Sequence, residues 1–210
     1  MSLTAFIHGV VLSTALIIAI GPQNVFVFQQ GVVQPRLSRA LPTIVTAGVS
    51  DTILVLLAVF GASVVVLQFA WVRAALFGSG SLFLFYYGWK LLTSPAIDED
   101  PQTTEFLGVR EQIGFTASVS LLNPHAILDT IGIVGTNGLA YSGRSRWLFA
   151  AGCILVSWGA FSGLAVAGWR LGESSNSNRW VHYFNPISAI FMWVFALLMG
   201  WRLLGLLKGV

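Results

Sequence analysis

Two aspartates lie inside apolar stretches of this chain, where a carboxylate is costly unless it has a task. The sequence has eight acidic residues, and Asp51 and Asp129 are the two outside polar connecting segments. A carboxylate at the centre of a membrane helix costs about 2.5–3.5 kcal/mol. Such groups typically mark the path of a cation or a proton, and the alternative is a packing acid that is hydrogen-bonded to backbone near the interface.

Two helix-breaking motifs accompany these aspartates. The first is Gly21-Pro22-Gln23-Asn24, and the second begins at Asn123-Pro124. Proline removes a backbone donor, and lipid offers no partner for the groups that are left free. We therefore expect both breaks to face protein or a watery cavity, as the substrate sites of many transporters do.

The second motif has the features of a half-helix that begins inside the membrane. Asn123 can cap its first turn, and Pro124 suits that turn. Its free N–H groups would then favour an anion such as a carboxylate. His125 lies four residues before Asp129 and so on the same helical face. His125 is a candidate proton carrier because its pKa is ordinarily near 6.5, with a packing role as the alternative. Gln23 and Asn24 would supply amide groups at the first break.

The composition indicates an all-α integral membrane protein. Of the 210 residues, 56% are hydrophobic and 9% are charged, against about 25% charged in soluble domains. Long apolar runs predict about six spanning helices, since a span needs about 20 residues. The runs are residues 3–30, 40–69, 71–92, 112–137, 147–171 and 181–206.

A polar, acidic connector at residues 93–111 divides the chain into two halves, 1–92 and 112–210. Each half opens with a run that contains a break, at Pro22 or at Pro124. This pattern predicts two three-helix repeats within a single transmembrane domain, and the odd number of spans would invert the second repeat.

Other classes of function have little support. The net charge of +3 gives no basic face for nucleic acid, and the single cysteine, Cys153, cannot form a thiol pair. No catalytic motif occurs, so we expect neither an enzyme nor a cofactor. A divalent-cation exporter is the alternative function, with His125, Asp129 and Asp51 as ligands. These ligands are sparse, so we expect no metal site.

The motifs resemble those of the LysE/ArgO group of basic amino-acid exporters. Residues 21–27 with Gln30-Gly31 resemble the group's first-helix motif, and residues 122–125 with 128–130 resemble its second-half motif. Ser50-Asp51 and Phe60-Gly61 fit as well, so the resemblance covers essentially the whole chain.

The resemblance implies an exporter of L-lysine or L-arginine in the bacterial inner membrane. Its expected partners are the cationic amino acid, the lipid bilayer and a coupling proton, with a homo-oligomer possible. The membrane potential or the proton gradient would drive export. Asp51 and Asp129 would then hold the cationic groups of the substrate, or one of them would carry the proton. The carboxylate of the substrate would meet Asn123, Gln23, Asn24 and the backbone N–H groups at the breaks.

Overall fold

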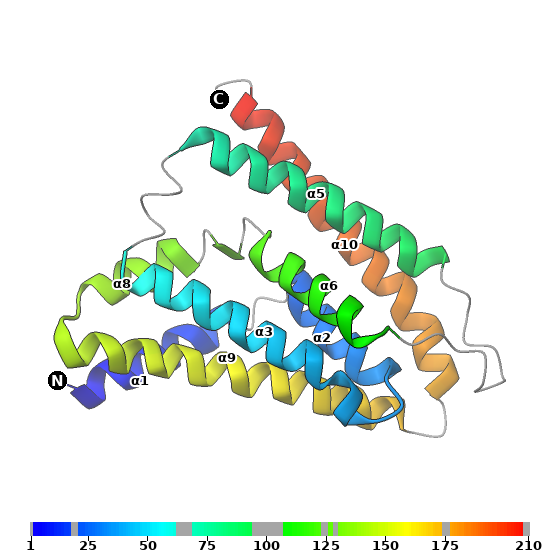
Figure 1. The fold of residues 1–210 in the computed structure, drawn as a ribbon, viewed down its shortest axis with the longest axis horizontal. Helices are drawn as coiled ribbons and strands as arrows, with labels where there is room; N and C mark the ends of the chain where they lie inside the picture. Colours follow the sequence, from blue (N-terminus) through cyan, green and yellow to red (C-terminus); the bar gives the residue numbers. More distant parts are fainter. Residues whose placement is uncertain are drawn as a thin grey trace.

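A computed structural model describes residues 2–17, 21–61, 69–93, 107–122, 126–127, 130–173 and 177–207. Within these ranges the regular structure is helical throughout, which confirms the predicted all-helical class. The elements (Figure 1) are α1 (Ser2–Ile17), α2 (Pro22–Val33), α3 (Leu37–Val59), α5 (Ala70–Thr93), α6 (Val109–Leu121), the π-helix η1 (Thr130–Gly135), α8 (Thr136–Leu139), α9 (Gly143–Gly172) and α10 (Ser177–Leu207).

Three of the described helices are long and apolar enough to cross a membrane. They are α3, α9 and the Pro186–Leu207 part of α10, and the bent pair α1–α2 would be a fourth span. The helix α5 has 24 residues, but its glycines, serines and tyrosines lower its hydropathy. The predicted number of six spans therefore stays a prediction.

The first predicted run is two helices, with the break at Gly21-Pro22. Leu3–Ile17 and Pro22–Val33 meet at an angle of 78°. Gly21 is the N-cap of α2 and has an extended backbone, and Pro22 stands in the first turn. Proline is favoured there because the N–H that it lacks would have no helical partner.

The fourth predicted run, 112–137, is also interrupted. The helix α6 ends at Leu121, and η1 and α8 together form the described part beyond the second motif. Residues 123–125 and 128–129 lie outside the described residues, so the predicted break at Pro124 is not tested.

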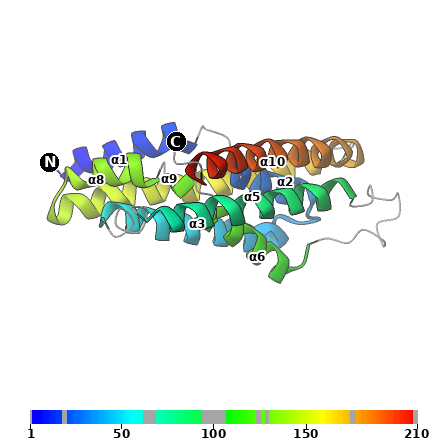
Figure 2. The same cartoon turned by 90° about the horizontal axis from the view of Figure 1, so that it is seen from above.

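The long helix α9 is the central support of the fold. The helices α1 and α2 both pack along α9, while α6 and η1 pack along α3, and α3 itself contacts α9. Figures 1 and 2 show α1, α2 and α3 running alongside α9. The bent pair α1–α2 and the segment from α6 to η1 are thus each held by the long helix of the other half.

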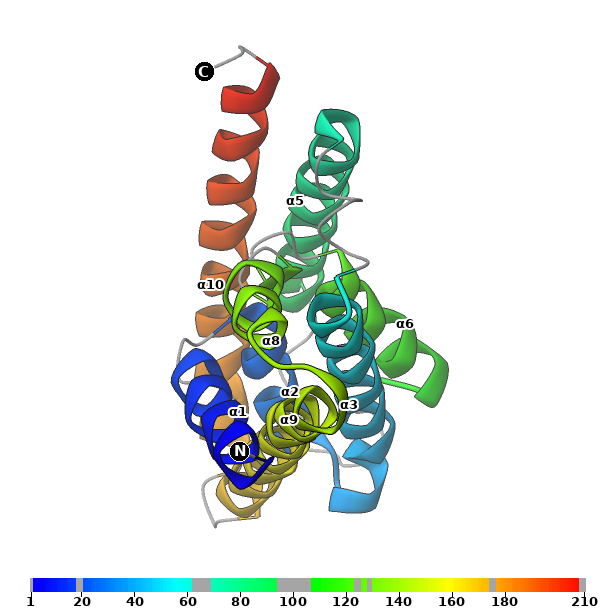
Figure 3. The ribbon, with the colours of Figure 1, turned by 90° about the vertical axis from the view of Figure 1, so that its left-hand side faces the viewer.

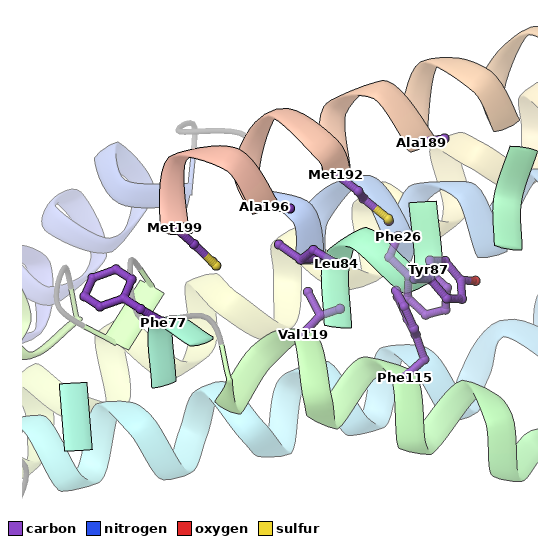
Figure 4. Packing of buried hydrophobic residues seen from close by; sticks show 10 residues of the cluster. All are labelled: Phe26, Phe77, Leu84, Tyr87, Phe115, Val119, Ala189, Met192, Ala196 and Met199. Atoms are coloured by element: carbon purple, nitrogen blue, oxygen red, sulfur yellow. The ribbon is translucent and has the colours of Figure 1, made fainter. Parts of the chain in front are cut away.

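The helices α5 and α10 form a separate pair that extends beyond the other helices at one end (Figure 3). A buried cluster joins this pair to α2 and α6 (Figure 4), with Phe26 next to Phe115 and Tyr87 at ring-centroid distances of 3.9 Å and 5.7 Å. Met192 of α10 completes this contact.

Two faces at opposite ends of α9 can be defined from contacts between connecting segments. At the connector face, the Gln34 side-chain amide donates to the Leu107 carbonyl at 3.3 Å, and Gly172 packs against Val32. At the terminal face, His8 Nδ1 lies 2.8 Å from the Tyr141 hydroxyl.

Candidate functional site

Asp51 lies near the middle of α3 and faces α9. Its carboxylate is partly buried and accepts a hydrogen bond from the Ser157 hydroxyl. Cys153, one turn earlier on α9, is buried close enough to interact electrostatically with Asp51. The predicted acid is therefore directed toward a neighbouring helix, which is what a residue on a transport path requires.

The approach of α3 to α9 beside Asp51 depends on a glycine. A side chain on Gly48 would overlap the Trp158 ring. The Trp158 Nε1–H donates to Thr52 Oγ1 at 3.1 Å, and the Thr52 hydroxyl donates to the Gly48 carbonyl at 2.6 Å. Small residues such as Gly48 and Ser50 beside Asp51 allow membrane helices to approach closely.

The Asp51–Ser157 pair forms a polar layer between two apolar clusters. On the side of the terminal face, Val55 and Val59 of α3 pack with Phe149 and Cys153 of α9. On the side of the connector face, other residues of the same helices pack with α2. They are Ile44, Ala47, Phe161, Ala165 and Val27.

The broken end of α1 and the start of α2 flank this polar layer. The Ser13 hydroxyl of α1 donates to the Cys153 carbonyl at 3.4 Å, and Val27 of α2 packs with Phe161. The part of α9 between these two contacts contains Ser157. The first helix break and Asp51 therefore lie at a similar level of the bundle.

Two polar side chains belong to the start of α2. The Asn24 amide donates to the Ile17 carbonyl at 3.2 Å and so satisfies a free acceptor at the end of α1. The Gln23 Nε2 is buried and has no hydrogen-bond partner among the residues that the structure describes. A buried amide without a partner costs about 1–3 kcal/mol, so Gln23 has a donor available for a ligand.

Four predicted site residues cannot be compared with the structure, because they lie outside the described residues: Asn123, Pro124, His125 and Asp129. Their neighbours Ile127 and Ile131 pack against Ala58 of α3. The described part of this segment therefore contacts α3. Among the described residues, no three His, Cys, Asp or Glu side chains come together as a group that could hold a metal ion.

Sequence reasoning missed Ser157 and Ser13. Both are small hydroxyl residues in apolar helices, where such residues commonly bond to their own backbone. Ser157 does so as well, with its hydroxyl 3.3 Å from the Cys153 carbonyl, so that its one proton is shared between this carbonyl and Asp51. Only the tertiary contact with Asp51 distinguishes Ser157, and that contact joins residues far apart in the sequence.

Comparison with known proteins agrees with this arrangement. Residues 14–202 match the LysE type translocator family. The "Putative amino-acid transporter YisU" of Bacillus subtilis (strain 168) is 45% identical over 196 residues, which are 93% of this chain and 88% of that protein.

Two relatives named "Arginine exporter protein ArgO" are also similar. That of Enterobacter sp. (strain 638) is 31% identical over 92% of both chains. That of Pectobacterium carotovorum subsp. carotovorum (strain PC1) is 29% identical over 94% of this chain and 98% of its own. No solved structure matches the chain. With its bent helix pair and several membrane-length helices, this chain belongs to the LysE type translocator family.

Proposed function

We propose that this protein exports a cationic amino acid, L-arginine or L-lysine, across the bacterial inner membrane. The observation that carries the proposal is the Asp51 carboxylate, directed into a polar layer beside a broken helix. The family and the names of the ArgO relatives support amino-acid export. A cationic side chain would compensate a charge that is otherwise costly at this depth.

The substrate binds with its two ends at different groups. Its guanidinium or ammonium group pairs with Asp51, because charge-assisted hydrogen bonds are the stronger kind. Its α-carboxylate meets the free N–H groups at the start of α2, and the Gln23 amide donates a further hydrogen bond. Asn24 keeps the end of α1 in place through the Ile17 carbonyl.

The second motif supplies the other half of the site in this proposal. Asp129 is the second acidic group and either binds the cationic substrate or carries a coupling proton. Asn123 donates to the substrate carboxylate, and His125 lies on the face of Asp129. The proton gradient or the membrane potential drives export.

Alternating access follows from rocking of the two proposed three-helix units, residues 1–92 and 112–210. The packing of each broken segment on the other unit's long helix supports this motion, since rocking would then move the two sets of site residues relative to each other.

Counterflow in proteoliposomes tests the substrate assignment. Vesicles are loaded with unlabelled arginine, lysine, leucine or no amino acid, and labelled arginine or lysine is added outside. We expect saturable uptake into vesicles loaded with either cationic amino acid, and background uptake with leucine or empty vesicles. Exchange of neutral amino acids at the same rate, or flux of a divalent cation alone, would refute the assignment.

A further inference from the structure

The helix α6 has a polar face that points inward. Gln112, Thr116 and Ser120 follow one another at intervals of four residues, and none is more than 2% exposed. The same helix exposes Val109 and Ile113, which are 58% and 44% exposed. The inward side of α6 therefore has a polar strip of Gln112, Thr116 and Ser120 beside the buried apolar residues Phe115 and Val119. An inward polar strip is expected for a helix that lines an aqueous path through a membrane.

This polar face leads from the connector face toward the second motif. The residues from Gln112 to Ser120 rise about 12 Å along the helix. The helix α6 packs against α3, which carries the buried Ser50 and the partly buried Asp51. The sequence after Ser120 continues directly to Asn123-Pro124. The hydroxyls of Thr116 and Ser120 donate to carbonyls of their own helix at 2.7 Å each, so they can line a path without an unsatisfied donor.

A network of buried hydrogen bonds closes the outer end of this face. The Leu107 carbonyl accepts from the Gln112 amide at 2.9 Å and from the Gln34 amide at 3.3 Å. Gln112 Oε1 accepts from the Thr43 hydroxyl at 2.9 Å, and Gln34 also donates to Gln30 Oε1 at 3.1 Å. The network joins α2 and α3 to the start of α6.

We propose that Gln112, Thr116 and Ser120 line the translocation path between the connector face and the central site, and that the Gln34–Leu107–Gln112–Thr43 network is the gate at its end. The inference rests on the proposed transport function. The gate is closed in this structure because Gln34, Thr43 and Gln112 are buried and Leu107 is half-buried. Rocking of the two units would separate α2 and α3 from α6 and break the network.

Cysteine labelling tests this path. Thr116→Cys and Ser120→Cys probe the polar face. Ser118→Cys is the matched control, because Ser118 also donates to a carbonyl of its own helix but lies off that face and is half-buried. The wild-type protein, whose single cysteine Cys153 is buried, gives the background rate of labelling. Each variant is reconstituted and treated with a membrane-impermeant maleimide on both sides of the vesicles, with and without Gln112→Leu.

We expect slow labelling at positions 116 and 120 while the gate is intact. Gln112→Leu removes hydrogen bonds to Leu107 and Thr43, so labelling at both positions should accelerate about tenfold, with no change at position 118. Gln34→Leu should act in the same direction and serves as the second gate variant should Gln112→Leu fail to fold.

Unchanged rates at 116 and 120 in a folded gate variant would overturn the proposal, as would an equal increase at 118, which would indicate general loosening. The labelling uses no substrate. A protein that shows the expected labelling pattern but exchanges no amino acid would refute the proposed function and support the path.

Discussion

At the scale of single residues, the hydrogen bond from Ser157 to Asp51 gives the carboxylate a defined direction. A carboxylate in an apolar setting needs partners for its lone pairs, and a hydrogen bond to a charged group contributes about 1.5–3 kcal/mol. One hydroxyl satisfies only part of this demand. Among the residues that the structure describes, no other hydrogen-bond partner is shown for Asp51, so its remaining acceptor capacity can serve a cation, as the proposed substrate site requires.

Ser157→Ala should therefore weaken substrate binding more than it affects folding. We expect the half-saturating arginine concentration in counterflow to rise roughly tenfold, with a smaller change in maximal rate, because Asp51 loses the group that orients it. Ser157→Thr keeps the hydroxyl and should restore most of the affinity. Unchanged half-saturation in Ser157→Ala, at wild-type protein level, would show that the contact has only a structural role.

Asp51 could be identified from the sequence because a charge in an apolar run is conspicuous by itself. Ser157 could not, because its role depends on a partner that only the folded chain brings near. The same reason applies to the Gln34–Leu107–Gln112–Thr43 network. Its members lie in four different segments of the predicted organisation: the runs 40–69 and 112–137, the connector 93–111 and the stretch between runs 3–30 and 40–69.

At the scale of secondary-structure elements, the break at Pro22 was predictable because proline and its neighbouring glycine act locally. The predicted run 40–69 shows the limit of such reasoning. The helix α3 ends at Val59, and Gly61 has a φ of 79°, a left-handed conformation that suits glycine and stops the helix. Hydropathy alone does not detect this stop.

The crossing of α1 and α9 makes a prediction about helix packing. A side chain on Gly152 would overlap the Phe6 carbonyl, and one on Gly9 would overlap the Phe149 carbonyl. Gly152→Val should therefore lower the free energy of unfolding by about 1–3 kcal/mol. The measurement is thermal unfolding in detergent.

Gly159→Val is the matched control for that experiment. It lies on the same helix, is exposed, and has no atom within 4 Å of an added Cβ. Its unfolding midpoint should stay close to that of the wild-type protein apart from the modest helix-propensity effect of valine. Equal losses in Gly152→Val and Gly159→Val would contradict the role of Gly152 in the crossing.

At the scale of the whole molecule, the first segment of each half packs on the long helix of the other half. The broken pair α1–α2 lies on α9, and the segment from α6 to η1 lies on α3, while α3 contacts α9 and α5 contacts α10. A pseudo-two-fold axis relating the halves would produce this pattern. The duplication of residues 1–92 and 112–210 remains a prediction.

The fold also predicts which connecting segments share a side of the membrane. The 30 residues of α9 span about 45 Å, enough to separate its ends across a bilayer core of about 30 Å. Arg36→Cys and Glu173→Cys should therefore react with an impermeant maleimide from one side, and Ser142→Cys from the other. All three residues are exposed. Labelling of positions 142 and 173 from the same side would refute this arrangement.

The central claim is that intramembrane carboxylates bind the transported cation. It is tested most directly by arginine counterflow with Asp51→Asn and Asp129→Asn, with Glu173→Gln as the matched control in an exposed connecting segment. Both aspartate variants should insert normally and exchange at the rate of protein-free vesicles, while Glu173→Gln should exchange like the wild-type protein. Wild-type exchange by Asp51→Asn and Asp129→Asn would contradict the account.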